Sequence, residues 1–463
     1  MRASELVVVA NRLPVNRVVR EGATRWEASP GGLVSALTPL LKGRECSWVG
    51  WAGTTGTPPG PFEQGGIRFV PVPLSRQELD TFYEGFSNRS LWPLYHNAVR
   101  TPEYHRHWWR PYVEVNQRFA DRVARVLAPH GTVWVQDYHL QLVPEMLRAL
   151  RPDATICFFL HIPFPPEELF SQLPWRREIL RGILGADLVG FQMPLAAQNF
   201  VELCRRFHKI QVRDDRLRFE GRSIRVGAFP ISIDVDHWER LATAPAIERQ
   251  AARIRRRLTP SRTILLGVDR LDYTKGIDRR LKAFDTLLAA RPELVERMVF
   301  IQVAVPSRER VGDYADLRTD IERLVGHING RHSRSGVVPV HYMYRSLPPD
   351  QLVAYYLAAD VMVVTSLCDG MNLVAKEYVA CRTDDTGVLV LSEFTGAAHE
   401  LRQALLVNPH DVDGLAATLE QAIAMPRAEA ARRMAALRRT VRQHDVYRWA
   451  RDFLGTRVER ASA

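Results

Sequence analysis

Short apolar runs alternate with longer amphipathic segments along most of this chain, and that alternation constrains its fold more than any other feature. The runs are about four to eight residues long and rich in β-branched residues, which is typical of parallel strands buried on both faces. One face of the helix expected over residues 277–290 carries Ile277, Leu281, Phe284 and Leu288. The pattern therefore predicts βαβ units and an α/β fold built from doubly wound sheets.

The chain has 463 residues, more than one hydrophobic core usually holds, so we expect two domains of about 200 residues each. The strand pattern stops near Pro230, and a charged helical stretch leads to the next strand at Thr263. We predict domains over residues 1–234 and 235–463. The predicted strands are LVVVAN, SWVGW, RFVPVPL, TVWVQD, ATICFFLH, DLVGFQ and IRVGAFP, then TILLGVD, MVFIQVA, VVPVHY, DVMVVTS and GVLVLSE.

The formal net charge is +11 and the isoelectric point about 9.7, with arginine supplying nearly all of the cations. Such a balance suits a nucleic acid, an anionic membrane or a phosphate-bearing substrate as partner, but it also arises when arginines cover solvated helix faces. No recognisable nucleic-acid-binding module is present, so we expect no nucleic acid partner. The arginine-rich stretch near residues 425–440 is predicted to be a solvated surface helix.

The five cysteines form no C-x-x-C pair, and several lie in apolar runs. They are predicted to be free buried thiols in a reducing compartment, not disulfides or a zinc site. The hydrophobic run in MRASELVVVANRLPV is too short for a signal peptide, and no stretch reaches the ~18 apolar residues that span a bilayer. We therefore expect a cytoplasmic protein with no membrane partner.

Polar residues follow three predicted strands of the second domain, at the ends where doubly wound sheets bind ligands. After TILLGVD come Arg270 and Lys275, on a loop that feeds a helix and so predicts an anion site. The alternative is that Arg270 pairs with a local acid such as Asp272 while Lys275 is solvated. Arg308 follows MVFIQVA at a similar level.

The stretch CDGMNLVAKEYVA directly follows the apolar run ADVMVVTSL. Asp369 and Gly370 end the strand, and Asn372 is a good N-cap for a helix that begins there. One turn into that helix, Glu377 suits a ribose diol, because a carboxylate accepts hydrogen bonds from both hydroxyls. A capping Asn and a salt-bridged Glu are the alternative. Three adjacent strand ends with complementary polar groups favour a binding site.

Polar groups also end strands of the first domain. Arg12 ends VVVANR, and Gly31-Gly32 stands ahead of a helix, where backbone N–H groups approach a phosphate, although a plain turn has the same residues. Asp137 and His161 end two different strands and are expected to converge on one ligand. The alternative for such a histidine is a structural role in the core.

Aromatic residues flank polar groups in FYEGFSNRSLWPLYH, where Tyr83 and Trp92 are nine positions apart with Asn88 between them. That arrangement suits a sugar face and its hydroxyls, although core packing is the default for aromatic residues. The sequence contains no H-x-x-x-H pattern, no Walker A sequence and no G-x-S-x-G elbow. We therefore predict no metal site.

Several long motifs make the chain recognisable: NRLPV, SPGGL, YEGFSNRSLWPLYH, WVQDYHLQLVP, HIPFPP, GVDRLDYTKGI, DGMNLVAKEY and SEFTGAA. In sequence and order they closely resemble the trehalose-6-phosphate synthase family, retaining glycosyltransferases of the GT-B type. The resemblance implies two doubly wound Rossmann-like domains facing across a cleft, the first binding the acceptor and the second the nucleotide sugar. The last helix, about residues 445–460, is expected to pack back on the first domain.

The implied activity is transfer of glucose from a nucleotide-glucose to glucose-6-phosphate, which gives α,α-trehalose-6-phosphate and begins trehalose biosynthesis. By resemblance, Arg270 and Lys275 hold the donor diphosphate, Glu377 binds the ribose and His161 bonds the donor glucose. The rest of the implied donor site is the glycine-rich loop of Gly31 and Gly32, the loop of Asp369, Gly370, Met371 and Asn372, and Leu373 and Val374 at the base.

Around the acceptor sugar and phosphate, the resemblance places Arg12, Trp51, Tyr83, Trp92 and Arg308, and it sets Asp137 as an acid against the acceptor. The catalytic set that it implies is Arg270, Lys275, His161, Asp369 and Asp137. No metal or other cofactor is implied, and the assembly is expected to be a homodimer or homotetramer.

One position departs from the family pattern, because Cys368 stands where Arg is usual. That change removes a cation beside the donor loop and leaves donor affinity and the choice among UDP-, GDP- and ADP-glucose open. Two other functions compete: a same-fold transferase or pseudo-glycosyltransferase with a cyclitol phosphate acceptor, and a catalytically silent nucleotide-sugar-binding regulatory subunit. The acceptor residues argue against the first, and the charged residues of the donor site argue against the second.

Overall fold

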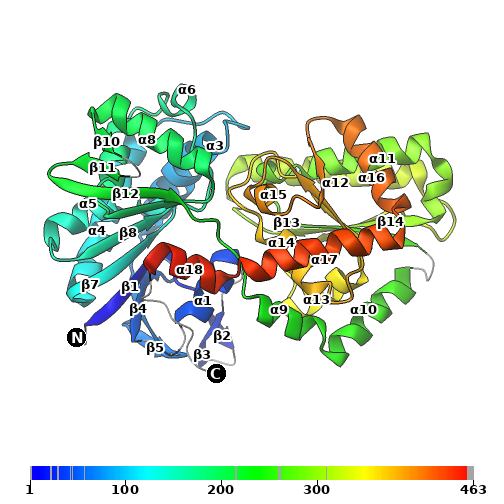
Figure 1. Cartoon of the computed structure of the whole chain (residues 1–463), viewed down its shortest axis with the longest axis horizontal. Coiled ribbons are helices and arrows are strands. Elements are labelled where there is room, and N and C mark those ends of the chain that lie inside the picture. The colour runs from blue at the N-terminus through cyan, green and yellow to red at the C-terminus, as the bar shows by residue number, and fades with distance from the viewer. Residues whose placement is uncertain are drawn as a thin grey trace. The chain divides into compact units, whose positions relative to one another are not determined.

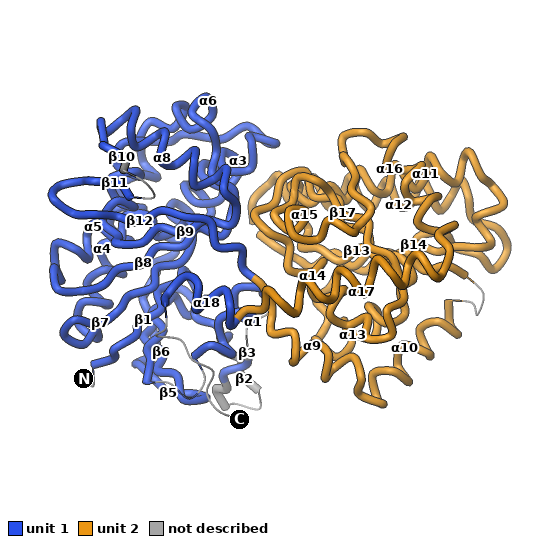
Figure 2. Tube along the Cα trace, in the orientation of Figure 1, with its two compact units in different colours: residues 1–231, 447–463 blue, residues 232–446 orange. Residues whose placement is uncertain are grey.

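The computed structural model describes residues 3–20, 23–28, 31–41, 43, 45–56, 58–213, 216–258, 262–308 and 310–455. The chain forms two compact units, residues 1–231 with 447–463 and residues 232–446 (Figure 2). The structural division falls between Ile231 and Ser232, close to the predicted boundary at 234/235. Across the described ranges, none of the helices has the length and apolar character needed to cross a membrane.

The first unit is built on one large sheet whose strands lie in the order β10-β11-β12-β9-β8-β7-β1-β4-β6-β5 (Figure 1). The strands from β12 to β6 pair in parallel, and β10, β11 and β5 add antiparallel edges. Their bounds are β1 Ser4–Arg12, β4 Cys46–Trp51, β5 Phe62–Gln64, β6 Ile67–Val72, β7 Leu127–Gln136, β8 Thr155–Phe159, β9 Leu188–Phe191, β10 Gln211–Arg213, β11 Arg216–Phe219 and β12 Arg222–Ala228.

Helices cover this sheet, and a hairpin of β2 Val15–Arg20 and β3 Ala23–Ala28 forms a second, two-stranded sheet. The α-helices of the unit are α1 Gly32–Leu41, α2 Arg76–Glu78, α3 Trp92–Tyr95, α4 Arg106–Val126, α5 Val143–Leu150, α6 Glu167–Phe170, α7 Arg176–Ile183, α8 Pro194–His208 and α18 Val446–Leu454. A π-helix, η1 Leu79–Leu91, joins α2 to α3, and a 3₁₀ turn, η2 Tyr138–Leu140, follows β7.

The last described helix, α18, packs on the sheet of the first unit. Its Phe453 ring lies 5.7 Å from Trp134 and 5.2 Å from Phe159, and it occupies the space that a side chain at Gly190 would need. The Trp449 indole donates a hydrogen bond to the Phe229 carbonyl at 3.0 Å. The end of the predicted last helix, residues 456–460, lies outside the described residues.

The second unit has one fully parallel sheet with strand order β15-β14-β13-β16-β17-β18. Its strands are β13 Thr263–Arg270, β14 Met298–Val305, β15 Val340–Tyr344, β16 Val361–Val364, β17 Val388–Ser392 and β18 Leu405–Val407. Its helices are α9 Val235–Ala242, α10 Pro245–Leu258, η3 Tyr273–Lys275, α11 Ile277–Ala290, η4 Pro292–Glu296, α12 Gly312–His332, α13 Pro349–Ala358, α14 Leu373–Cys381, α15 Gly396–Glu400, α16 Val412–Ala424 and α17 Arg427–Gln443.

Each predicted strand is present in the structure, and the helix expected over 277–290 has those bounds. The strands that the pattern missed are β2, β3, β5, β10, β11 and β18. Most of these are edge or hairpin strands, and several carry alternating charges such as VNRVVR, so their sequences lack the continuous apolar run of a buried parallel strand. The five cysteines are free and buried, as predicted.

The prediction of a solvated helix near residues 425–440 was partly wrong. Helix α17 does form there, but it buries Met434, Leu437 and Val441, and it contacts α14 and β17. Apolar residues at helical spacing thus give the arginine-rich segment an inward face, and the arginines exposed elsewhere on it are Arg427, Arg432, Arg439 and Arg442.

Candidate active site

Three neighbouring strands of the second unit, β14, β13 and β16, deliver the predicted charged residues to one edge of the sheet. Arg270 ends β13 and is exposed, whereas the next cation along the loop, Lys275, is only 8% exposed. Gly276 turns the chain into α11 with a φ of 59°, and a Cβ there would collide with the Thr365 carbonyl. This close packing of the two loops holds Lys275 against the end of β16.

Lys275 forms an ion pair with Asp369, with 2.6 Å between Nζ and Oδ2. The same carboxylate oxygen accepts hydrogen bonds from the Ser366 hydroxyl and the Asn372 amide, both at 3.2 Å. The two charged side chains are 11% and 13% exposed. The alternative in which Lys275 is solvated is therefore wrong. The Asp369 carboxylate holds its loop in place through these three contacts.

Asn372 caps helix α14 as predicted, because its side chain accepts a hydrogen bond from the Ala375 N–H at 3.1 Å. Its own backbone is left-handed, with a φ of 84°. The turn after β17 supports this loop from behind, since Gly396 has no room for a Cβ beside the Gly370 carbonyl. The start of α14 is thus held by close backbone packing with its N–H groups at the carboxyl edge of the sheet.

Arg308, at the end of β14, pairs with Asp272 at 2.8 Å and also donates a hydrogen bond to the Tyr314 hydroxyl. Burial raises the pKa of Asp272, but the charges of Arg308, Arg270 and Lys275 outweigh it and bring that pKa down to about 2. The alternative from the sequence paired Asp272 with Arg270. Asp272 does pair with an arginine, but the direct ion pair is with Arg308.

Glu377 lies one turn into α14 and is 7% exposed. Its carboxylate accepts a hydrogen bond from the Tyr356 hydroxyl at 3.0 Å, and no ion pair of Glu377 is found in the described part of the chain. Burial raises the pKa of Glu377 to about 7, and the Tyr356 hydrogen bond opposes that rise. The alternative of a salt-bridged glutamate is therefore wrong. The Glu377 carboxylate can accept a further hydrogen bond from a ligand.

One buried arginine that the sequence analysis missed holds these loops together. Arg280 is fully buried in α11, and its guanidinium contacts Asp269 at 2.7 Å, the Thr365 hydroxyl at 2.8 Å and the Lys275 carbonyl at 3.0 Å. It therefore links the ends of β13 and β16 through charge-assisted hydrogen bonds. The sequence could have predicted this role. Arg280 lies on the face of the helix that packs on the sheet, and a charge buried there needs partners.

In the first unit, Arg12 and Trp51 end adjacent strands β1 and β4, and the guanidinium lies 5.3 Å from the centre of the indole ring. Arg12 also donates a hydrogen bond to Asn16 at 3.1 Å. Trp51 in turn lies 6.0 Å from the Tyr83 ring. The structure thus joins these three predicted residues into one cluster, with the exposed cation at its edge.

The π-helix η1 decides which way the aromatic segment faces. At about 3.6 residues per turn, residues nine apart would lie on opposite faces, but the wider π-helix has about 4.4 residues per turn and returns them to one face. Tyr83 accordingly stacks on His139 at 5.7 Å, and Trp92 lies 5.6 Å from Tyr138. Tyr138 also donates a hydrogen bond to Asn88 at 2.8 Å.

Asp137 and His161 meet after β7 and β8, where Asp137 accepts the His161 backbone N–H at 3.2 Å. The His161 ring lies between two glutamines, with Nε2 at 2.8 Å from Gln136 and Nδ1 at 3.4 Å from Gln192. Burial lowers the pKa of this histidine to about 3. The two residues are therefore neighbours, their convergence on one ligand stays a prediction, and the ring is neutral at physiological pH.

The remaining predicted residues occupy positions around these clusters. Gly31, with a φ of 150°, stands before Gly32 at the start of α1. Met371 is buried, and Leu373 and Val374 are partly exposed on the first turn of α14. The described residues contain no group of three acidic, histidine or cysteine side chains placed to hold a metal ion.

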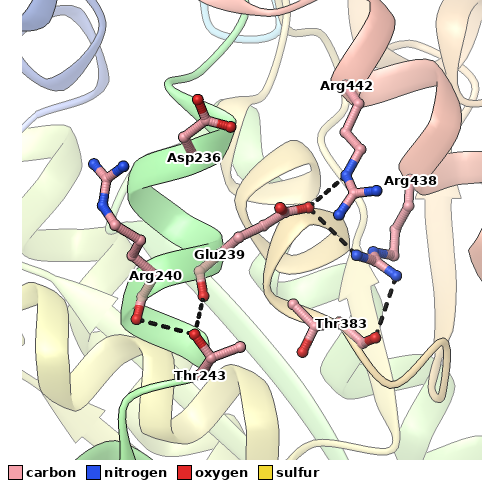
Figure 3. Close-up of a pocket in the computed structure, with 7 residues that line it drawn as sticks. All are labelled: Asp236, Glu239, Arg240, Thr243, Thr383, Arg438 and Arg442. Carbon is pink, nitrogen blue, oxygen red and sulfur yellow. Dashed lines mark hydrogen bonds and ion pairs between the residues drawn. The ribbon is translucent and has the colours of Figure 1, made fainter. Parts of the chain in front are cut away.

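A hollow elsewhere in the second unit contains none of the predicted site residues (Figure 3). At its centre Glu239 of α9 accepts hydrogen bonds from Arg442 at 2.7 Å and Arg438 at 3.3 Å, both on α17. Arg438 also pairs with Asp385 at 2.6 Å. These contacts join the first helix of the unit to its last and so have a structural explanation.

Comparison with known proteins identifies the family of this chain. The model of glycosyltransferase family 20 matches residues 4–457. A trehalose-6-phosphate synthase of Mycolicibacterium smegmatis is 56% identical in an alignment of 461 positions that covers 97% of this chain and 92% of the relative. That of Mycolicibacterium gilvum is 54% identical, covering 99% of this chain and 94% of the relative.

Solved structures agree with the sequence relatives. An α,α-trehalose-phosphate synthase (UDP-forming) of Burkholderia vietnamiensis has a TM-score of 0.90 at 35% identity, covering 98% of this chain and 96% of that one. An enzyme of this name from Burkholderia xenovorans, in complex with glucose-6-phosphate, has a TM-score of 0.90 at 34% identity, covering 97% and 98%. The chain has two Rossmann-like units, and both solved structures cover nearly all of it. The predicted GT-B fold class is therefore confirmed.

Proposed function

The chain belongs to glycosyltransferase family 20, and we propose on that premise that it transfers glucose from a nucleotide-glucose to glucose-6-phosphate. The product is α,α-trehalose-6-phosphate, the first intermediate of trehalose biosynthesis. The observation that carries the proposal is the cluster at the carboxyl edge of the second sheet. There Arg270 and Lys275 lie with the capped start of α14 in a chain that matches the family over nearly its whole length.

On the donor side, Arg270 and Lys275 bind the diphosphate together with the N–H groups at Asn372, and the family resemblance also assigns Gly31 and Gly32 to the diphosphate. An exposed guanidinium, a lysine held in place by Asp369 and a helix N-terminus all favour an anion. The loop from Asp369 to Asn372 surrounds the sugar, and His161 bonds it. Glu377 accepts the ribose hydroxyls, and Leu373 and Val374 border the base.

On the acceptor side, Arg12 and Arg308 bind the phosphate of glucose-6-phosphate, and Trp51, Tyr83 and Trp92 bind its sugar. Arg12 is exposed beside the Trp51 ring, and among the described residues it has no ion pair with a carboxylate that a phosphate would have to break. Arg308 has Asp272 as a fixed partner, which orients its guanidinium. Asp137 accepts a hydrogen bond from the acceptor.

The transfer proceeds with retention and by attack on the face that the leaving group occupies. The acceptor hydroxyl forms the new bond to the anomeric carbon as the bond to the diphosphate breaks, and the leaving diphosphate takes the hydroxyl proton. Arg270, Lys275 and the start of α14 stabilise the negative charge that grows on the leaving group. This arrangement of cations and backbone dipoles needs no metal ion or other cofactor.

A donor panel tests the proposal directly. Purified protein is incubated with glucose-6-phosphate and UDP-, GDP- or ADP-glucose in turn, and the disaccharide phosphate and its anomeric configuration are read by NMR. We expect α,α-trehalose-6-phosphate with at least one donor, and a cyclitol phosphate as acceptor serves as the control. No transfer to glucose-6-phosphate from any donor would contradict the proposal. We further propose that the enzyme is cytoplasmic and acts as a homodimer or homotetramer.

A further inference from the structure

A directed chain of hydrogen bonds passes through the His161 ring. It begins at the backbone N–H of Ile231, which donates to Gln192 Oε1 at 2.9 Å. Gln192 Nε2 lies 3.4 Å from His161 Nδ1, and His161 Nε2 lies 2.8 Å from Gln136 Oε1. It ends at the backbone carbonyl of Trp134, which accepts from Gln136 Nε2 at 3.5 Å.

The two backbone groups at the ends set the direction of every bond between them. The Ile231 N–H only donates, so Gln192 turns its oxygen toward it and its NH₂ toward His161 Nδ1. The Trp134 carbonyl only accepts, so Gln136 turns its NH₂ toward it and its oxygen toward His161 Nε2. Both constraints require an acceptor at Nδ1 and a proton on Nε2. They therefore select the same neutral tautomer independently.

The surroundings of the chain preserve this state. Gln136 is fully buried and Gln192 is 4% exposed, so water does not replace either partner. The rings of Phe159 and Trp449 lie 4.7 Å and 6.3 Å from the imidazole. A second proton, on Nδ1, would face the NH₂ of Gln192, and burial already lowers the pKa of the histidine to about 3. The Asp137 carboxylate contacts His161 as well, and it accepts the backbone N–H.

We propose that Gln136 and Gln192 are positioning residues that hold His161 as the neutral Nε2–H tautomer, so that the ring carries no positive charge beside the transferred glucose. The inference rests on the proposed function for the identity of that sugar. Positive charge develops on the glucosyl ring as its bond to the leaving group breaks. An imidazolium beside that ring would oppose the charge in a water-poor site, whereas a neutral imidazole does not.

Replacing Gln192 by Glu tests the direction of the chain. A carboxylate accepts from Ile231 but offers no donor to Nδ1, so the histidine gains a proton there and its pKa rises. We expect kcat at pH 7 to fall by about 100-fold while the KM for glucose-6-phosphate stays unchanged, and kcat to recover as pH rises. Gln192→Met, which keeps the size but neither charge nor donor, is the matched control and should lose activity without the new pH dependence.

The tautomer itself is read from ¹⁵N NMR of histidine-labelled full-length protein, with the His161 signals assigned from their loss in His161→Gln. We expect protonated Nε2 and unprotonated Nδ1 from pH 5 to pH 9, with and without UDP, and Nδ1 protonated in Gln192→Glu. An active enzyme with the proton on Nδ1 would overturn this inference alone. If the protein has the proton on Nε2 of His161 but transfers glucose from none of the donors, the proposed function is overturned. The purpose assigned to the tautomer is then overturned with it.

Discussion

The two units place opposite kinds of chemistry at the ends of their parallel strands. In the second unit the strand ends carry buried ion pairs, Lys275 with Asp369 and Arg308 with Asp272. In the first unit they carry aromatic rings and amides together with the Asp137 carboxylate, and the cation of the cluster, Arg12, is exposed. The same kind of sheet thus supports one site built from charges and another built from shape and neutral hydrogen bonds.

The difference follows from what each side is proposed to bind. Buried charges are costly to desolvate, and they persist where their partners hold them in one geometry. A cluster of that kind is preorganised for charge that grows on a leaving diphosphate. The sugar of the acceptor offers hydroxyls and an apolar face, which rings and amides suit, and its phosphate is assigned to the cations Arg12 and Arg308. The predictions below separate the electrostatic side from the neutral one.

The largest effect is expected for Arg270→Ala. Loss of this cation should lower kcat/KM for the nucleotide-glucose by about 1000-fold, because the leaving charge loses a preorganised partner. The melting temperature should change little, since Arg270 is exposed. Steady-state kinetics and thermal unfolding measure both, and Arg253→Ala, an exposed arginine on α10, is the control. Near-normal turnover would remove Arg270 from the site.

The Lys275–Asp369 pair is tested by a double-mutant cycle. Lys275→Met and Asp369→Asn should each lower the free energy of unfolding by about 3 kcal/mol, because each leaves the other group buried without its partner. The double variant should lose less than the sum. Urea unfolding gives the coupling energy, and kinetics should show all three variants impaired. Additive losses would mean that the two charges do not depend on each other.

On the neutral side, Tyr83→Ala removes the ring that stacks on His139 and faces Trp51. We expect the KM for glucose-6-phosphate to rise by about tenfold, because an aromatic surface under the sugar is lost. Tyr83→Phe keeps the ring and should behave nearly as the parent enzyme. A matching rise in the donor KM would show that the ring does not serve the acceptor alone.

Glu377 should make donor binding depend on pH. Burial raises its pKa to about 7, and the ribose hydroxyls need the ionised carboxylate. The donor KM should therefore rise as pH falls through 7, by up to about tenfold per unit, and Glu377→Gln should flatten that profile. Because the pKa of Glu377 in the folded protein lies above the usual 4.5, Glu377 also affects stability. Its contribution to the free energy of unfolding decreases as pH rises from 4.5 to about 7. A flat parent profile would contradict the role.

The smallest effect is expected for Cys368→Arg. The new cation would lie next to Asp369, beside the proposed diphosphate site, and should lower the donor KM by about threefold. Cys368→Ser controls for loss of the buried thiol, whose side chain is 7% exposed. The same donor panel shows whether the order of UDP-, GDP- and ADP-glucose changes. An unchanged KM and donor order would separate Cys368 from donor choice.

Much of this fold was readable from the sequence, because continuous apolar runs such as TILLGVD occur where strands are buried on both faces. The placement of Arg270 and Asp369 at one edge followed as well, since neighbouring parallel strands end on the same side of a sheet. The short charged strands of the hairpin β2–β3 were missed, because their pairing depends on contacts that no local pattern records.

Only the tertiary structure decided which groups are partners. The sequence offered Arg270 as a local partner of Asp272 and a solvated Lys275 as one alternative, but long-range packing determined that Arg308 pairs with Asp272 and that Lys275 reaches Asp369. The widened turn of η1, which brings Tyr83 and Trp92 to one face, likewise has no local signature.

The sequence by itself determined the layers, the strand ends and the residue types available there, because hydrophobic periodicity and chain direction are local properties. The structure decided the pairings, the buried Arg280 and the tautomer of His161, because these depend on distances between residues far apart in the chain. Burial makes each such contact specific, since a buried polar group without its partner costs free energy.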